Sequence, residues 1–161
     1  MTNRFFISIL VLFLYSGCTR DDICAEDTPT TPLLQVEFKD ITDRTENKPV
    51  TSFRLVLNGT DTLASVNTTD TLVSVPLNTL ANTTLYEFLI SSDNEDNGDN
   101  LTFTYSTQEQ YVNRACAFRI IYNEFQTALE PEVGNGNWIR DFTVQQTTIE
   151  DETEAHLTIF H

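Results

Sequence analysis

The stretch LLQVEFKD, residues 33–40, alternates between apolar and polar side chains from Leu34 onward. Leu34, Val36 and Phe38 are apolar, and Gln35 and Glu37 lie between them. Successive side chains of a β-strand point to opposite faces, so this pattern gives one apolar face and one polar face. The stretch therefore predicts a strand with one face buried against a core.

Similar stretches follow along the whole chain, separated by turn-forming residues. They lie at residues 50–60, 60–68, 69–77, 83–92, 100–107, 115–125, 137–149 and 153–161. No segment keeps a helical period. Many short strands joined by Gly, Pro, Asn and Asp turns are typical of a sandwich or a barrel. We expect an all-β fold, an antiparallel β-sandwich of roughly seven to nine short strands. An immunoglobulin-like subtype is one option, although Trp138 follows Cys116 instead of preceding it.

Two of these stretches repeat one another. TDTLASVNT (60–68) and TDTLVSVPL (69–77) agree at six of nine positions. Two such short copies cannot build a solenoid, so we expect two short strands. The repeated Asp-Thr-Leu also resembles an acceptor motif for O-linked glycans on exported proteins of some Gram-negative bacteria. That resemblance marks Thr62 and Thr71 as candidate glycosylation sites.

The stretch DNEDNGD, residues 93–99, is expected to be the turn of a hairpin between 83–92 and 100–107. It resembles the start of a calcium loop, with oxygen-bearing residues at alternate places and Gly98 sixth. Thr104 stands where a bidentate Glu would complete the ligand shell. We therefore interpret residues 93–99 as a solvated acidic turn and predict no specific calcium site there; weak binding of a cation by its carboxylates is the alternative.

The first 17 residues have the composition of a secretory signal peptide that is removed from the mature protein. Arg4 precedes ten apolar residues, FFISILVLFL (5–14), and small residues follow at Ser16 and Gly17. Ten residues span only about 15 Å as a helix, too little to cross a bilayer.

Ser16, Gly17 and Cys18 resemble the lipobox of bacterial lipoproteins, with Tyr15 where Leu is commoner. The resemblance implies cleavage before Cys18 and lipid on that cysteine, which would be the membrane anchor. Ordinary signal cleavage with an unmodified Cys18 is the alternative. Thr19 after the cysteine favours the outer membrane in Gram-negative sorting. The following Arg20-Asp21-Asp22 looks like a tag for display on the cell surface.

The mature chain then divides into two parts. Residues 18–31 form a polar tether, and residues 32–161 form a single sandwich domain. The tether contains Cys24, and the domain contains Cys116. In an oxidising compartment these two cysteines predict a disulfide, with Cys116 buried in a strand. Two free thiols or a reactive cysteine are the alternatives.

Composition limits the partners. The sequence has 24 acidic and 9 basic residues and a net charge of −15, which disfavours nucleic acid. His156 and His161 are five residues apart in one expected strand and would face opposite sides, so they predict no shared metal. We interpret His156 as a surface residue. We expect no cofactor, no metal site and no catalytic residues.

The chain as a whole resembles the small, functionally uncharacterised all-β lipoproteins of Gram-negative cell surfaces. The stretches CTRDDIC, RACAFRIIY and AHLTIF carry the resemblance. We predict a lipid-anchored binding or structural module, not an enzyme, with a protein or glycan partner. A surface protein that captures glycans or nutrients through exposed aromatic residues is one alternative, with Tyr111 and Trp138 as candidates. A hydrolase that uses paired carboxylates is another.

Overall fold

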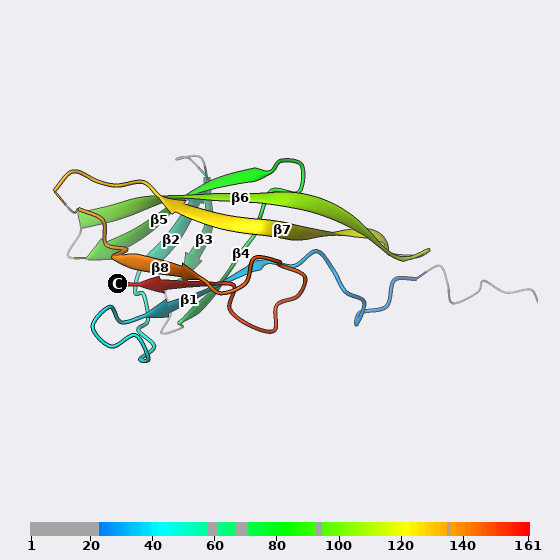
Figure 1. Cartoon of the computed structure of the whole chain (residues 1–161), viewed down its shortest axis with the longest axis horizontal. Helices are drawn as coiled ribbons and strands as arrows, with labels where there is room; N and C mark the ends of the chain where they lie inside the picture. The colour runs from blue at the N-terminus through cyan, green and yellow to red at the C-terminus, as the bar shows by residue number, and fades with distance from the viewer. Residues whose placement is uncertain (1–22, 58–60, 67–70, 93–94, 135) are drawn as a thin grey trace, which may run out of the picture.

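In the computed structural model, the residues that the structure describes form nine strands in two sheets that pack face to face (Figure 1). The structure describes residues 23–57, 61–66, 71–92, 95–134 and 136–161. These residues contain strands and connecting segments, and none of them is helical. The expected all-β sandwich is therefore confirmed. Among the described residues, no helix has the length and hydropathy needed to cross a membrane.

The smaller sheet has the strand order β4-β1-β9-β8. Its strands are β1 (Leu34–Lys39), β4 (Leu72–Val75), β8 (Asp141–Val144) and β9 (Leu157–Phe160). β4 and β8 run antiparallel to their neighbours, but β1 and β9 pair in parallel, with Val36 opposite Leu157. The sandwich is thus not purely antiparallel, because β9 runs in the same direction as its neighbour β1.

The larger sheet has the order β3-β2-β5-β6-β7 and is antiparallel throughout. Its strands are β2 (Phe53–Leu57), β3 (Asp61–Val66), β5 (Thr83–Ser92), β6 (Glu95–Asn113) and β7 (Ala117–Leu129). β6 has 19 residues and β7 has 13, so these strands are not short as expected. Their hairpin extends well beyond the rest of the sandwich (Figure 1).

Aromatic rings fill the space between the sheets. Phe38 of β1 packs edge-on against Phe53 of β2 with ring centroids 5.7 Å apart, and Phe53 packs in the same way on Phe88 at 5.3 Å. Phe103 and Phe125 continue the row at 5.7 Å. All of these rings are buried. Edge-to-face pairs at such distances add to the free energy that burial of the rings supplies. The alternation in residues 33–40 does mark a core-facing side.

The chain crosses from one sheet to the other through Pro76, Leu77 and Asn78, and three tyrosines hold this crossing. Their hydroxyls donate to three successive carbonyl oxygens: Tyr86 to Pro76 at 2.8 Å, Tyr122 to Leu77 at 3.3 Å and Tyr105 to Asn78 at 2.9 Å. The hydrogen bond to Leu77 is buried and the other two are partly buried. A carbonyl shielded from water without a donor is costly, so these hydroxyls permit an irregular segment to lie against the core. We call the three side chains the tyrosine clamp.

The acidic turn expected at residues 93–99 is wrong in its extent. Residues 95–99 belong to β6 and pair with β5, and Gly98 lies opposite Leu89. A Cβ at Gly98 would collide with the Glu87 carboxylate and would lie 2.7 Å from Leu89 Cδ1. Gly98 therefore leaves room for the side chains of its cross-strand neighbours. The sequence pattern predicted a glycine in a turn, whereas Gly98 lies within a strand.

The two copies of the repeat form two strands, as expected, but in different surroundings. The first copy gives β3, at the edge of the larger sheet, and the second gives β4, at the edge of the smaller one. The pairing partner therefore determines the sheet that each copy joins: β3 pairs with β2, and β4 pairs with β1.

Candidate functional site

The far end of the β6–β7 hairpin is joined to the tether by a disulfide. The Sγ atoms of Cys24 and Cys116 are 1.97 Å apart and their Cα atoms 5.0 Å apart, across 92 residues of sequence. The pair expected from the sequence is therefore confirmed at disulfide distance. We call this bond the clasp. Cys116 is not buried in a strand as expected: it lies half-buried in the turn before β7, and Cys24 is exposed.

Local hydrogen bonds shape the turn that presents Cys116. Asn113, the last residue of β6, accepts from the backbone N–H groups of Ala115 at 2.9 Å and Cys116 at 2.8 Å through its Oδ1. Ala117 has a positive φ of 57°. An Asn side chain that accepts from the backbone two and three residues onward is a common way to fix a tight turn. The turn thus directs the cysteine toward the tether.

The tether lies beside β7 on its way to the sandwich. Its Thr31 Oγ1 accepts from the backbone N–H of Ile120 at 3.0 Å, and the clasp holds it at Cys116. Between these two attachments it borders an open pocket of about 320 Å³ together with Arg119 and residues 150–152. Arg119 donates to the Gln110 side chain at 2.6 Å and to the Glu150 carbonyl at 2.9 Å. The tether is therefore tied to the hairpin at two points.

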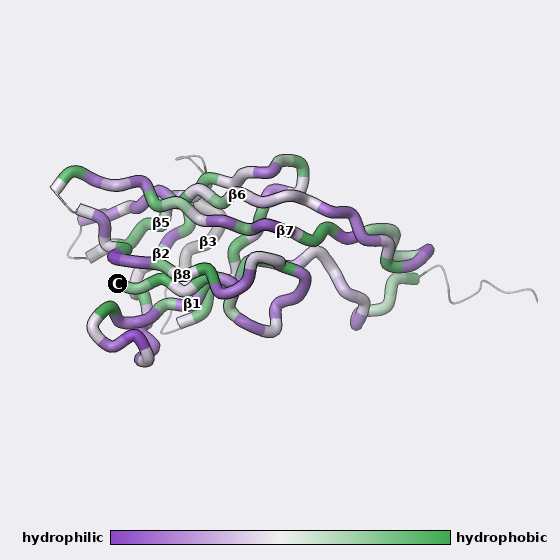
Figure 2. Tube along the Cα trace, viewed as in Figure 1, coloured by the Kyte–Doolittle hydropathy of each residue, from purple (hydrophilic) through white to green (hydrophobic). Residues whose placement is uncertain are grey.

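Exposed aromatic rings accompany the clasp. Tyr111 and Phe118 lie opposite each other on β6 and β7, with ring centroids 5.4 Å apart, and each is about 60% exposed (60% and 59%). Ile23 of the tether, next to Cys24, is 77% exposed. Figure 2 shows hydrophobic and hydrophilic residues mixed at the end of the hairpin and a hydrophobic stretch at the start of the described tether. We call residues 110–119 the hairpin tip.

The two aromatic candidates from the sequence have different environments. Tyr111 is exposed at the hairpin tip, but Trp138 is buried and donates from Nε1 to the Phe88 carbonyl at 2.8 Å. Trp138 is therefore a core residue. Phe118 was not identified from the sequence, because residues 115–125 read as the most apolar strand of the core. Its pairing with Tyr111 follows from the register of β6 and β7, which the local sequence does not show.

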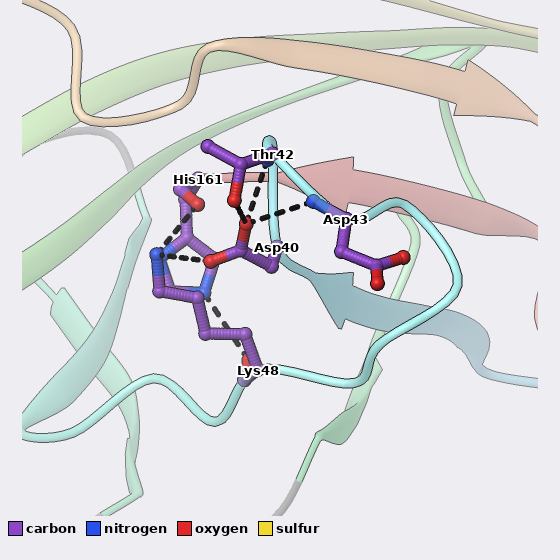
Figure 3. Close-up of polar contacts among 5 residues, drawn as sticks. All are labelled: Asp40, Thr42, Asp43, Lys48 and His161. Atoms are coloured by element: carbon purple, nitrogen blue, oxygen red, sulfur yellow. Dashed lines mark hydrogen bonds and ion pairs between the residues drawn. The ribbon is translucent and has the colours of Figure 1, made fainter.

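The loop after β1 gathers several charged groups (Figure 3). It borders an open pocket of about 360 Å³ lined by Asp40, Thr42, Asp43, Glu46, Asn47, Lys48 and Pro49. Asp40 accepts from the Thr42 hydroxyl, from the backbone N–H of Thr42 at 2.6 Å and from that of Asp43 at 3.1 Å. These hydrogen bonds, first that of the Thr42 hydroxyl, hold the pKa of Asp40 far below its usual range.

Lys48 connects this loop to the end of β9. Its Nζ lies 3.1 Å from Asp40 Oδ2 and donates to the His161 carbonyl at 2.8 Å, and His161 Nε2 is 3.2 Å from the Lys48 carbonyl (Figure 3). The His161 ring also packs edge-on against Phe38 and Trp138. Burial lowers the pKa of His161. The carboxylate of Asp40 is engaged by its own loop, so this cluster organises the loop.

The interpretation of His156 as a surface residue is wrong. Its side chain is buried, and Nδ1 accepts from the backbone N–H of Gln35 at 3.0 Å. The face of the smaller sheet away from the core is covered there by hydrogen-bonded polar side chains, including Gln35, Glu152 and Ser74. Burial, opposed by nearby Asp151 and Glu152, lowers the pKa of His156. His156 and His161 have separate sets of contacts.

Residues 93–99 are not a uniformly solvated acidic turn. Asp99 is fully buried: its Oδ1 accepts from Asn137 Nδ2 at 2.9 Å and its Oδ2 from the backbone N–H of Ile139 at 2.7 Å. Asp96 lies 2.7 Å from Arg54 and accepts from Ser91 at 2.5 Å. Asp93 lies outside the described residues. Within the residues that the structure describes, no group of three His, Cys, Asp or Glu side chains could hold a metal ion.

The structure describes only some of the modification sites expected from the sequence. Cys18 lies outside the described residues. Thr62 belongs to β3 and pairs with Val56, and Thr71 is half-buried, its carbonyl accepting from Phe38 N at 2.8 Å. Lipid on Cys18 and glycans on Thr62 and Thr71 stay predictions.

Comparison with known proteins adds one finding. No curated protein and no solved structure matches the chain. One family model does match, over residues 50–161, a range that contains β2 to β9 and the hairpin tip. That range is well over half of the 161-residue sequence. The chain therefore belongs to DUF6452, a family of unknown function.

Proposed function

We propose that this protein is a lipoprotein of the outer membrane, anchored by lipid on Cys18, whose sandwich acts as a binding or structural module. In this proposal the signal peptide, residues 1–17, is removed, and the tether connects the lipid to the sandwich. The body of the protein is displayed on the membrane and takes a protein or glycan partner. It does not act as an enzyme.

The observation that carries the proposal is the clasp. Cys24 is six residues after Cys18, and its sulfur is at bonding distance from that of Cys116. Disulfides form and persist in oxidising compartments outside the cytosol. The lipobox-like sequence that ends at Cys18 and the disulfide between Cys24 and Cys116 both favour export. In this proposal, the lipid-bearing segment leaves the sandwich at the end where the clasp lies.

A binding role is favoured over catalysis by how the polar groups are used. A carboxylate that transfers protons needs access to a substrate. Asp99 is buried and accepts two hydrogen bonds from protein groups, and Asp40 is occupied by Thr42, Asp43 and Lys48. Both histidines are likewise engaged by backbone groups, of Gln35 and of Lys48. These contacts support the fold, whereas two paired aromatic rings at the hairpin tip, Tyr111 and Phe118, are exposed to solvent.

The anchor is tested by expressing the full precursor in a Gram-negative host. Mass spectrometry of the purified protein should find a mature polypeptide that begins at Cys18 and carries diacylglyceryl and acyl groups. A Cys18→Ala variant should lose the lipid and leave the membrane fraction. An unmodified mature N-terminus, or a Cys18→Ala variant that stays membrane-bound, would contradict the proposal.

The partner is tested in the same material. The lipidated protein is purified by affinity from detergent-solubilised outer membranes, in parallel with the Cys18→Ala variant. One stoichiometric partner, recovered with the lipidated form alone, would support a role in a membrane assembly. Digestion of intact cells with a protease should remove the sandwich if it is displayed on the surface, and full protection would contradict that display.

A further inference from the structure

The hairpin tip combines features that suit the boundary between lipid headgroups and acyl chains. Tyr111 and Phe118 form an exposed aromatic pair, and exposed Ile23 adds an aliphatic side chain beside the clasp. Aromatic side chains, Tyr and Trp above all, are enriched at membrane interfaces, where an apolar ring and a polar edge are both satisfied. Exposed rings paired outside the core need such a partner to be removed from water.

The charges at the hairpin tip differ from those of the whole chain. The sequence has 24 acidic and 9 basic residues, but residues 110–123 contain no Asp or Glu and two arginines, Arg114 and Arg119. Arg114 is exposed in the turn that carries the clasp. An arginine at the membrane surface can place its stem along apolar groups and its guanidinium among phosphates. The hairpin tip itself thus has no carboxylates, which suits a phospholipid surface. Glu26 and Asp27 of the tether and residues 150–152 border the pocket beside Arg119.

The length of the tether places this end close to the bilayer. Cys18 and Cys24 are six residues apart, and a fully extended chain spans about 3.3–3.6 Å per residue, so their Cα atoms are at most about 22 Å apart. The described tether begins beside the hairpin tip (Figure 1). The acidic loop at residues 40–48 and the loop at residues 130–137 lie at the other end of the sandwich (Figure 1).

We propose that the hairpin tip rests in the headgroup region of the bilayer that carries the Cys18 lipid, with Tyr111, Phe118 and Ile23 as the inserted side chains. This inference rests on the proposed lipid anchor. Because Asp21 and Asp22 precede the clasp in the sequence, the aromatic rings and not charge attraction are the main source of affinity. In this orientation the hairpin tip contacts the membrane, and the loops at the other end of the sandwich face away from the membrane.

The test uses the full mature lipoprotein in vesicles of phosphatidylcholine whose acyl chains are brominated, because bromine quenches tryptophan fluorescence at contact. A Phe118→Trp variant puts the probe in the hairpin tip. A Val133→Trp variant is the matched control, because Val133 is fully exposed in the loop at the opposite end. Native Trp138 is buried and contributes the same background to both variants.

We expect several-fold stronger quenching for Phe118→Trp than for Val133→Trp, together with a blue shift of its emission. Equal quenching of the two variants would overturn the inference. Hydrogen exchange of the unsubstituted protein gives a second measurement, in which the amides of residues 110–119 slow several-fold on vesicles relative to detergent. Protection that requires another protein from native membranes, and is lacking on pure lipid, would show that the occupant is a protein and would also overturn it.

Flotation of the vesicles separates this inference from the proposed anchor. A lipidated protein that floats with the vesicles but shows no selective quenching contradicts the membrane contact alone. A protein that carries no lipid on Cys18 and does not float contradicts both. A Tyr111→Ser, Phe118→Ser double variant should still float, held by its lipid, but should lose the protection of residues 110–119.

Discussion

Gln35 and His156 are joined by two hydrogen bonds that run in opposite directions. The backbone N–H of Gln35 donates to His156 Nδ1 at 3.0 Å, and the backbone N–H of His156 donates to the Gln35 carbonyl at 2.9 Å. This exchange extends the pairing of β1 with the segment that enters β9. It also requires a neutral imidazole, because a protonated Nδ1 could not accept.

The histidines predict a dependence of stability on pH. Burial lowers the pKa of both His156 and His161 below the usual 6.5, so the unfolded chain binds protons first as the pH falls. Their contribution is complete above pH 6.5 and is lost as the pH falls from there through the lowered pKa values. Chemical denaturation between about pH 8 and about pH 5 should show this loss. His156→Gln and His161→Gln should each flatten the slope, and an unchanged slope in the double variant would refute the prediction.

The tyrosine clamp predicts a specific cost for removing one hydroxyl. Tyr105→Phe leaves the buried Thr84 hydroxyl and the partly buried Asn78 carbonyl without this partner, and an unsatisfied buried group costs about 1–3 kcal/mol. We expect the free energy of unfolding to fall by that amount in urea titrations. Tyr111→Phe, at an exposed ring, is the control and should change it by less than about 0.5 kcal/mol. Equal effects of the two variants would contradict the role of the clamp.

The same hydroxyls predict how the protein responds to alkali. Burial raises the pKa of Tyr86 and of Tyr122 to about 12, above the usual value of 10. Their contribution to stability is therefore complete below pH 10 and is lost as the pH rises toward 12. A spectrophotometric titration should show tyrosinate appearing late and together with unfolding. Titration of all tyrosines near pH 10 in the folded protein would count against the buried clamp.

Asp99 predicts a penalty for a nearly isosteric change. Asp99→Asn replaces one of two accepting oxygens with an amide nitrogen, which cannot accept from Asn137 or from the Ile139 backbone. We expect a loss of about 1–3 kcal/mol in the free energy of unfolding, measured in urea. Asp96→Asn, at an exposed ion pair, should stay close to the wild type. Stability of Asp99→Asn equal to that of Asp96→Asn would show that the buried contacts contribute little.

The clasp predicts the largest effect on stability. Its two cysteines close a loop across 92 residues, and the chain-entropy account assigns such a loop about 4–5 kcal/mol. The Cys24→Ser, Cys116→Ser variant should melt at a lower temperature than the oxidised protein and match the reduced one. Proteolysis should also cut its tether faster, because the tether then loses its attachment at Cys116 and keeps the hydrogen bond between Thr31 and Ile120 of β7. A double variant as stable as the oxidised protein would contradict this.

Local patterns predicted the strands well and their surroundings less well. The alternation around Val36 and Phe38 correctly identified the core-facing side of β1, because a strand with one apolar face must bury it. Gly98 misled the prediction, since glycine serves turns as well as sites where neighbouring side chains crowd the backbone. Local sequence does not distinguish these two uses.

Buried polar residues were harder to predict for a different reason. His156 and Asp99 look solvent-exposed in their local sequence, but their partners, Gln35 and Ile139, are 121 and 40 residues away. Only the completed pairing of β1 with β9, and of β6 with its neighbours, brings these partners within reach. The disulfide could be predicted because only two cysteines remain after Cys18. The location of Cys116 in a turn could not, since RACAFRIIY is apolar on both sides of it.

The parallel pairing of β1 with β9 has a consequence for the order of folding. β1 lies between β4 and β9, so one of its edges has no hydrogen-bonding partner until the most C-terminal strand is available. Contacts of such long sequence separation form slowly, and they leave an open strand edge exposed in the meantime. A chain threaded through a translocation channel from its N-terminus would present β1 first and β9 last. In the export proposed above, assembly of the smaller sheet would then wait until β9 has also been translocated.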